Sequence, residues 1–388
     1  MDNGKLILTR RSVMKGALVG VGTLAMGGLF ACSQDPQQQD GSQDASKDTT
    51  PQQKPEQTPA TETWTFVDQA DYEVSVQVPV KRMVVMQHHS LDMLAQLGAQ
   101  DSVVGIESKW ISNLGEYMRD VFPGIDDLPT PGELSEWNVE QIAALEPDVV
   151  IAASQANPDA MQQIRDLGIP VVVVSLRGEG KQEEAQNPRL SDADSAYTEG
   201  CQWAIETLGK LTGKEQKARE IWDFCIEGRS IVEEAISEIE DDERIRVFVA
   251  CPDEQTYGND KYVGCQLLRA GAINVAAADI QGYKAYTFEM LANWDPEVII
   301  VQDRYSDVYD SIISEAKYAE LSAVKNNKVI LAPYWTKPWG NPDTDSIALG
   351  ELWLSHMFYP EKIEASLVQK RAEEFYQNFY GVEFNGHV

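Results

Sequence analysis

Two adjacent histidines, His88 and His89, are the residues best suited by type and position to ligand chemistry. They are two of only four histidines in 388 residues, and they follow an apolar run over residues 83–86 that predicts a buried strand. An imidazole can ligate a metal or donate a hydrogen bond to an anion. Neighbouring side chains usually point in different directions, so we expect only one of them to face a ligand. His88 or His89 is therefore a candidate metal ligand, with Glu107 as a remote carboxylate partner, although no metal-site spacing motif accompanies them.

Aromatic and cationic residues gather at the other predicted strand ends of an otherwise acidic chain. With the histidines, the candidate ligand-binding residues are His88, His89, Lys109, Trp110, Arg177, Tyr257, Tyr262, Arg304, Tyr305, Trp335, Lys337 and Trp339. Aromatic walls suit a flat or partly apolar ligand, and cations suit anionic groups on it. A metal chelate offers both properties, so we expect such a ligand.

Alternating short strands and helices must position these residues. Strands are predicted at residues 64–67, 72–78, 83–86, 103–106, 148–152, 171–175, 246–250, 298–302 and 328–332. The first two predict a β-hairpin, and the others are separated by helical patterns, which indicates parallel sheets covered on both faces. Ligands of such sheets bind beyond the carboxyl ends of the strands.

The two halves of this pattern are similar to each other. Residues 138–151 align without gaps to residues 287–300, and both segments carry a glutamate near the helix start, Glu140 and Glu289. A long helix predicted over residues 214–240 separates the halves. The sequence therefore predicts an α/β fold of two Rossmann-like lobes with parallel sheets, joined by a long interdomain helix, with a ligand cleft between the lobes. The expected bounds are 62–195 for the first lobe, 196–243 for the connecting helices and 244–388 for the second lobe.

Composition excludes several classes of function. The chain has 32 Lys and Arg against 62 Asp and Glu, a formal charge of -30. Such a surface repels nucleic acid and anionic lipid. There is no uninterrupted apolar run of the length that a spanning helix needs. Nucleophile-elbow, zincin, phosphate-loop and C-x-x-C motifs are all absent from the sequence, so we expect no enzyme.

The N-terminus has the features of an export signal. Residues 9–15 resemble a twin-arginine motif, a glycine-rich apolar stretch follows, and residues 29–32 resemble a lipobox that ends in Cys32. We expect a signal peptide over residues 1–31, and a lipidated Cys32 followed by a disordered polar linker over residues 32–61. The mature protein would then be anchored outside the cytoplasmic membrane by lipid.

The order of these features resembles the solute-binding lipoproteins of iron-siderophore, haem and cobalamin ABC importers. The resemblance rests on the opening hairpin, the two repeated helix–strand blocks, residues 208–213 before the long helix, and residues 348–360. It implies a bilobed, monomeric binding protein without an intrinsic cofactor, which delivers a ferric siderophore, haem or corrinoid to a permease dimer and its ATPase. It also implies that Glu140 and Glu289 dock on arginines of that permease.

Other interpretations stay open at this point. The same fold can bind a free oxyanion or a metal ion, which predicts a small polar pocket instead of a broad aromatic one. The chain can also be an exported sensor or metalloprotein without a transport role. Four cysteines of the mature chain, Cys201, Cys225, Cys251 and Cys265, can pair outside the cytoplasm, although buried thiols are the simpler expectation.

Overall fold

The computed structural model describes residues 61–180 and 187–388. The expected signal peptide, Cys32 and all but the end of the expected linker lie outside these residues. By its contacts the chain divides into residues 1–56 and 57–388, and the second unit contains all of the described elements. Across the described ranges, no helix combines the length and the apolar character needed to cross a membrane.

The described chain opens with the predicted β-hairpin. Strand β1 (Glu62–Val67) pairs antiparallel with β2 (Glu73–Val78). In β2 the residues Val74, Val76 and Val78 are buried and their neighbours are exposed. This period of two places one face of the hairpin against the apolar core.

The first lobe is built on a four-stranded parallel sheet. Its strands are β3 (Met83–Met86), β4 (Val103–Ile106), β5 (Val149–Ala153) and β6 (Val171–Val174), in the order β4-β3-β5-β6. Nearly every residue of these strands is buried because helices cover both faces, which explains their continuous apolar sequences.

The second lobe repeats this arrangement. Its strands are β7 (Ile245–Ala250), β9 (Ala272–Asn274), β11 (Val298–Gln302) and β12 (Val329–Ala332), in the order β12-β11-β7-β9. In both sheets the first strand lies inside, the second at one edge, and the third and fourth on the other side. The internal repeat predicted from the sequence is therefore confirmed as a repeat of topology.

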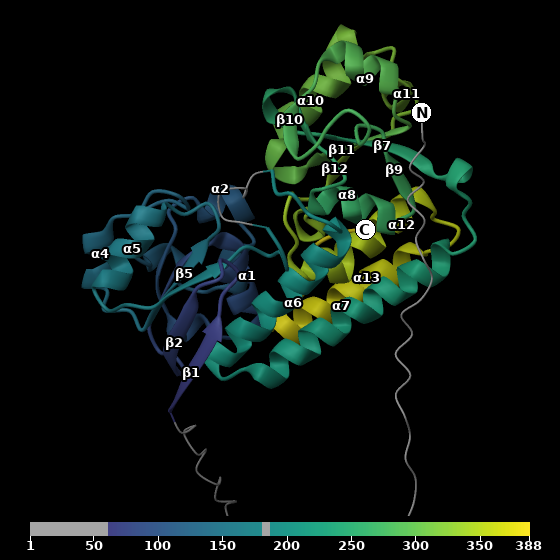
Figure 1. The fold of residues 1–388 in the computed structure, drawn as a ribbon. Helices are drawn as coiled ribbons and strands as arrows, with labels where there is room; N and C mark the ends of the chain where they lie inside the picture. The colour runs from purple at the N-terminus through teal and green to yellow at the C-terminus, as the bar shows by residue number, and fades with distance from the viewer. Residues whose placement is uncertain (1–60, 181–186) are drawn as a thin grey trace, which may run out of the picture. The chain divides into compact units, whose positions relative to one another are not determined.

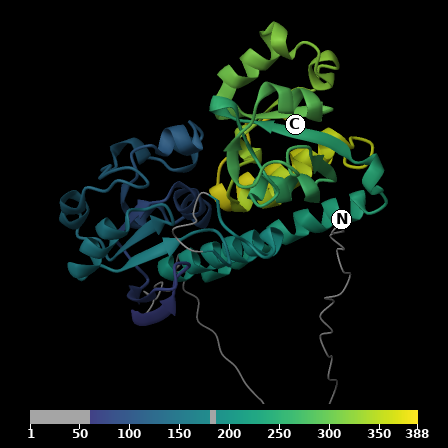
Figure 2. The ribbon, with the colours of Figure 1, turned by 45° about the horizontal axis from the view of Figure 1, so that its top comes forward.

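Two long helices lie between the sheets in the sequence. Helix α6 (Ala193–Thr212) turns at Gly213, whose φ of 70° is left-handed, into α7 (Glu215–Ile236). Figures 1 and 2 show the two helices side by side, with α12 and α13 along α7. Helix α7 ends four residues before the predicted end. Acidic residues 238, 240, 241 and 242 follow it, and negative charge at a helix C-terminus opposes the macrodipole.

Shorter helices complete both lobes (Figure 1). In the first lobe they are α1 (His88–Leu97), α2 (Trp110–Leu114), α3 (Met118–Val121), α4 (Val139–Ala144) and α5 (Pro158–Asp166). In the second lobe they are α8 (Tyr262–Arg269), α9 (Phe288–Trp294), α10 (Ser306–Ser314), α11 (Ser322–Lys325), α12 (Glu351–Phe358) and α13 (Ala365–Phe375). The sequence did not predict the small antiparallel pair of β8 (Gln255–Tyr257) and β10 (Tyr283–Ala285), because three-residue strands carry too little periodicity.

The apolar core has three parts. One cluster covers a face of the first sheet and a second covers a face of the second sheet. The third and largest contains residues of both lobes together with α6, α7 and the C-terminal helices. Both lobes therefore share one packed apolar region.

Candidate functional site

The predicted histidines lie in the first turn of α1, immediately after β3. Their ring centroids are 4.5 Å apart, and the His89 ring is 5.5 Å from that of Trp339, which it meets edge-on. Both rings thus lie in one contact group, and whether one or both face a ligand stays a prediction. Successive residues at a helix start are about 100° apart, whereas those of a strand point to opposite faces, so both rings can lie on one side.

We call His88, His89 and Trp339 the histidine group. Arg304, which follows β11 in the second lobe, contacts this group. Its guanidinium lies 4.6 Å above the Trp339 ring and donates from Nη1 to the carbonyl oxygen of Asn113 in α2, at 2.8 Å. Its Nε donates to Gln302 Oε1 at 2.8 Å. The cation is thus held between the lobes by two directed hydrogen bonds and a ring face.

The electrostatic surroundings keep both imidazoles neutral. Burial is the main cause that lowers the pKa of His89, to about 3, and the cations of Lys337, Arg304 and Lys261 lower it further. Burial likewise lowers the pKa of His88, and His89, Arg304 and Lys337 add to the effect. The site therefore combines neutral imidazoles with nearby cations, although the chain as a whole is strongly acidic.

Several ring nitrogens in this group are buried without a hydrogen-bond partner among the described residues. They include His88 Nδ1, His89 Nδ1 and Trp339 Nε1. An unpaired buried polar group costs stability, so such groups are retained where a ligand completes them. Touching rings with unsatisfied nitrogens make this group a candidate site for a small polar ligand.

Lys337 lies deeper than a ligand-binding cation would. Its side chain is fully buried, and Nζ forms ion pairs with Asp92, with Asp345 at 2.6 Å and with Asp343 at 3.4 Å. These three carboxylates could together hold a metal ion, but the ammonium already lies among them. Lys337 thus balances buried carboxylates of both lobes, and its Nζ lies 5.5 Å from the centroid of the Trp339 ring.

Little in the sequence indicates this carboxylate cluster. Asp92 is 245 positions from Lys337, and a lone Asp in an apolar helix carries no motif. Asp343 and Asp345 form a D-x-D pair directly after Asn341 and Pro342, which is the one local signal that could have drawn attention to them. Tyr380 donates to Asp92 Oδ1 at 2.8 Å, so even the C-terminal turn takes part.

Three other residues that the sequence predicted to bind the ligand are Arg177, Tyr257 and Tyr305. Arg177 follows β6 in the first lobe and is 2 % exposed. Burial is the main cause that lowers the pKa of Lys261 to about 8, and the charge of Arg177 lowers it further. Tyr257 packs on Tyr283 with ring centroids 4.7 Å apart. Tyr305 lies next to Arg304, whose guanidinium is 5.1 Å from its ring. These residues bring further cations and rings toward the same end of the sheets.

Other predicted residues are placed elsewhere. Lys109 is more than half exposed and pairs with Glu133 at 3.4 Å. Trp110 is buried at the start of α2, with Arg119 over its ring. Trp335 is completely buried between Trp353 and Phe384. Tyr262 is 1 % exposed, and its hydroxyl contacts Glu351 and Ser346. Their surroundings are those of packing and surface residues, since each has partners within the chain.

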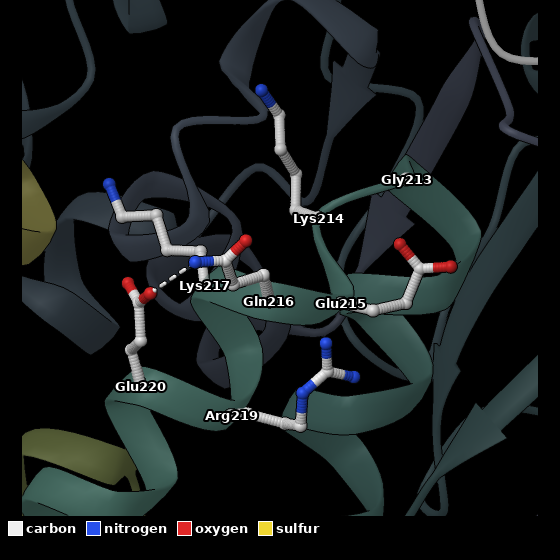
Figure 3. Close-up of a pocket in the computed structure, with 7 residues that line it drawn as sticks. All are labelled: Gly213, Lys214, Glu215, Gln216, Lys217, Arg219 and Glu220. Atoms are coloured by element: carbon white, nitrogen blue, oxygen red, sulfur yellow. Dashed lines mark hydrogen bonds between the residues drawn. The ribbon is translucent and has the colours of Figure 1, made fainter. Parts of the chain in front are cut away.

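A recess at the start of α7 is separate from this group (Figure 3). Its lining residues are Gly213, Lys214, Glu215, Gln216, Lys217, Arg219 and Glu220. The side chains drawn there come from the turn between α6 and α7 and from the start of α7, and Gln216 donates to Glu220 at 2.9 Å. Cations and carboxylates are mixed along this segment, so the recess has no consistent charge that would select a ligand.

The four described cysteines are free and buried. Burial raises the pKa of all four thiols, which makes them unreactive at neutral pH. The expectation of buried thiols is confirmed for these residues.

The two repeated glutamates occupy equivalent exposed positions. Glu140 is the second residue of α4, after the N-cap Asn138, and Glu289 is the second residue of α9, after the N-cap Thr287. Each helix precedes the third strand of its sheet, β5 or β11. Hydrogen bonds at the helix start lower the pKa of Glu289, so this carboxylate is ionised.

Known proteins resemble this chain along most of its length. A family model described as periplasmic binding protein matches residues 83–334. The molybdate-binding protein MolA of Haemophilus influenzae is 37% identical over 318 residues, which cover 82% of this chain and 91% of MolA. The solved structure of MolA bound to molybdate superimposes with a TM-score of 0.79 and 36% identity, over 83% of this chain and 99% of that one.

More distant relatives share the fold. A periplasmic solute-binding protein from Veillonella parvula is 19% identical with a TM-score of 0.67, over 84% of this chain and 94% of that one. The fold class of two α/β lobes with parallel sheets is confirmed by these structures and by the sheet order. The resemblance drawn from the sequence is confirmed as well: the chain belongs to the periplasmic binding protein family, whose members are extracytoplasmic substrate-binding components of ABC transporters.

Proposed function

We propose that this chain captures a small tetrahedral oxyanion of the molybdate class for an ABC importer. The observation that carries the proposal is the contact group of His88, His89 and Trp339, whose buried ring nitrogens lack hydrogen-bond partners in the described ranges, beside the guanidinium of Arg304. An oxyanion has acceptors on every side, so it needs converging N–H donors and a cation with little water.

The charge of the surroundings favours an anion over a metal cation. Arg304 and Lys337 act on both histidines and Lys261 on His89, and together they outweigh the opposing charge of Asp92, so they would repel a cation at the imidazole nitrogens as they repel a proton. A free-metal site on His88 or His89 is therefore the weaker hypothesis. The neutral rings suit a dianion because they donate hydrogen bonds without the cost of burying further charge.

The size of the ligand is the second argument. We had expected broad aromatic walls for an iron or cobalt chelate, but Trp335 and Tyr262 have packing partners inside the protein. The remaining donors belong to a few touching side chains. The relative MolA, at 37% identity, is named for molybdate. Relatives named for ferric citrate and petrobactin are 23% identical, so the chelate is retained as the competing ligand.

Isothermal titration of the full chain tests the proposal. Molybdate, tungstate, sulfate and phosphate are compared with ferric citrate and cobalamin under one set of conditions. We expect saturable binding of molybdate or tungstate with one site per chain. Saturation by a chelate, with no heat from any oxyanion, would replace the oxyanion with the chelate hypothesis.

The remaining expectations extend this role. We infer that residues 1–31 direct export, that Cys32 carries the lipid anchor and that residues 62–195 and 244–388 are the binding lobes, joined by residues 196–243. The protein would act as a monomer. Glu140 and Glu289 would dock the two lobes on the permease, which is supported by their exposure and their equivalent positions in the repeated units.

A further inference from the structure

Gln302, the last residue of β11, links the cation of the proposed site to the loop that carries Trp339. Its Oε1 accepts from Arg304 Nε at 2.8 Å, and its Nε2 donates to the carbonyl oxygen of Pro338 at 3.0 Å. We propose that Gln302 is a positioning residue that fixes the Arg304 guanidinium beside Trp339 and thereby sets the affinity of the site for the oxyanion. The inference rests on the proposed function and identifies a determinant of that site's affinity.

The side-chain amide of Gln302 can make these two bonds in only one orientation. A guanidinium only donates hydrogen bonds and a carbonyl oxygen only accepts them, so the amide oxygen faces Arg304 and the amide nitrogen faces Pro338. An apolar side chain can make neither bond, and an ionised carboxylate has no hydrogen to donate to the carbonyl oxygen. A glutamine at this position therefore joins two segments that other residue types of similar size would leave apart.

The internal repeat shows that the fold itself does not require a polar residue here. Strands β5 and β11 are the third strands of their sheets, and the ungapped alignment of the two halves, extended by two residues, places Ala153 opposite Gln302. Both side chains are buried. An amide without partners is costly to bury, so a position that served packing alone would favour an apolar residue, as in the first lobe. The polar side chain of Gln302 is therefore explained by its contacts with Arg304 and Pro338.

Arg304 is held from both lobes, which restricts the orientation of its guanidinium. Gln302 accepts from Nε, and the carbonyl oxygen of Asn113 in α2 accepts from Nη1 at 2.8 Å. A guanidinium has more N–H groups than these two bonds use, so donors remain for a ligand. The guanidinium lies 4.6 Å from the Trp339 ring, which His89 also contacts. Its charge is thus fixed beside the histidine group.

A cation that is already fixed binds an anion more tightly than a mobile one. Ordering a long side chain when a ligand binds costs free energy, and Gln302 imposes this order before the ligand arrives. The bond to Pro338 acts in the same direction, because it holds the peptide that precedes Trp339 at a set distance from Arg304. Gln302 therefore raises the affinity for molybdate through Arg304, without a contact of its own with the ligand.

A double-mutant cycle in the full chain tests the inference. Calorimetry with molybdate gives Kd for the unmodified chain, Gln302→Met, Arg304→Met and the double variant, since methionine fills space without an amide or a charge. We expect Kd to rise by about 3-fold to 10-fold in Gln302→Met and by about 10-fold to 100-fold in Arg304→Met. The double variant should bind as Arg304→Met alone does, because a residue that acts through Arg304 has no effect without it.

Gln266→Met is the matched control. Gln266 in α8 is also fully buried, and its Nε2 donates to the carbonyl oxygens of Thr336 at 3.3 Å and Ser346 at 3.2 Å. It anchors the same loop on the other side of Lys337, but no described contact joins it to Arg304. Both glutamine variants should lower the free energy of unfolding in urea, whereas only Gln302→Met should raise Kd.

Arg304→Lys keeps the test independent of whether Gln302→Met folds. Arg304 is only partly buried, and lysine preserves its charge. An ammonium cannot reproduce the planar fork that bonds to Gln302 and to the Asn113 carbonyl oxygen at once. The cation then loses its fixed direction, and we expect Kd to rise by about 3-fold to 10-fold.

The outcomes separate this inference from the proposed function. A loss of affinity in Gln302→Met that disappears in the Arg304→Met background supports the inference. Additive effects of the two substitutions, or equal rises of Kd in Gln302→Met and Gln266→Met, overturn it. An unchanged Kd in Arg304→Lys also overturns it and leaves the oxyanion function in place. No binding of molybdate or tungstate by the unmodified chain overturns the proposed function, and the inference with it.

Discussion

At the scale of single residues, two buried tryptophans allow a matched comparison. Trp339 Nε1 and Trp335 Nε1 are both buried without a hydrogen-bond partner within the described chain. Trp339 touches His89 and Arg304, whereas Trp335 packs on Trp353 and Phe384. One indole therefore lies in the proposed site and the other in the core.

Trp339→Phe should weaken oxyanion binding while the ring contacts remain. A hydrogen bond to a charged acceptor is worth about 1.5–3 kcal/mol, so we expect Kd to rise by about 10-fold to 100-fold. Trp335→Phe is the control, and its Kd should not change. Titration calorimetry with molybdate checks both variants, and equal effects in the two would show that Trp339 donates nothing to the ligand.

A second prediction concerns the buried charge of Lys337. Lys337→Met leaves three buried carboxylates, Asp92, Asp343 and Asp345, without a counter-charge. Removal of one partner of a buried ion pair costs about 3–5 kcal/mol, which urea unfolding at neutral pH can measure. The exposed lysine variant Lys325→Met, whose partner is Glu320, should change the unfolding free energy very little.

The pH dependence of that loss follows from the carboxyl pKa values. Burial raises the pKa of Asp343 and Asp345 in the folded state, and Lys337 opposes the rise. Without Lys337 the folded state binds more protons than the unfolded state, so its stability falls as pH rises above the ordinary Asp range. The difference between Lys337→Met and the unmodified chain should therefore shrink toward acid. A difference that is constant with pH would contradict this assignment of charge.

At the scale of elements, the close approach of α7 and the turn η9 (Ser346–Gly350) depends on Gly228. A Cβ at Gly228 would lie 2.6 Å from the Ala348 carbonyl oxygen, which belongs to the backbone and cannot move alone. Gly228→Ala should therefore destabilise the protein by about 1–3 kcal/mol, more than the roughly 1 kcal/mol that alanine gains in a helix.

Thermal or urea unfolding of Gly228→Ala measures this cost. Ser230→Ala on the exposed side of the same helix is the control, with an expected change within about 0.5 kcal/mol. Since η9 directly follows Asp345, displacement of this turn should also weaken molybdate binding. A stabilised Gly228→Ala would show that the two backbones have room to separate.

The elements themselves were largely predictable from the sequence. Continuous apolar runs such as residues 83–86 and 298–302 coincide with β3 and β11, because buried parallel strands need apolar residues on both faces. Helix ends were less certain. The helix expected over residues 214–240 ends at Ile236, four residues early. The strand ends that precede His88, His89 and Arg304 were predicted correctly, whereas the role of these residues in binding stays a prediction from the rule for ligands of parallel sheets.

The assembly of the site could not be predicted in the same way. Lys337 and Trp339 are two residues apart, yet one pairs with buried carboxylates and the other contacts His89 and Arg304. The left-handed φ of 40° at Lys337 turns the chain between them. Such reversals follow from contacts with distant residues, such as Asp92 in the other lobe, and these contacts leave no spacing pattern in the sequence.

At the scale of the whole molecule, the docking proposal predicts that ligand binding and transport can be separated. Glu140 and Glu289 are exposed at the starts of α4 and α9, and neither touches the histidine group in any described contact. Their roles, if they dock on cationic residues of a permease, depend on charge alone. A charge reversal should then leave the binding of molybdate unchanged.

The double variant Glu140→Arg and Glu289→Arg should bind molybdate with an unchanged Kd but fail in uptake. Like charges placed in contact at an interface cost several kcal/mol, so uptake in proteoliposomes that contain the permease and ATPase should fall by at least about tenfold. Asp101→Arg and Glu238→Arg, two other exposed reversals, are the controls for general charge effects. Normal uptake by the double variant would remove the docking role, and a chain that binds the oxyanion without supporting any uptake would point to a sensor instead of a carrier.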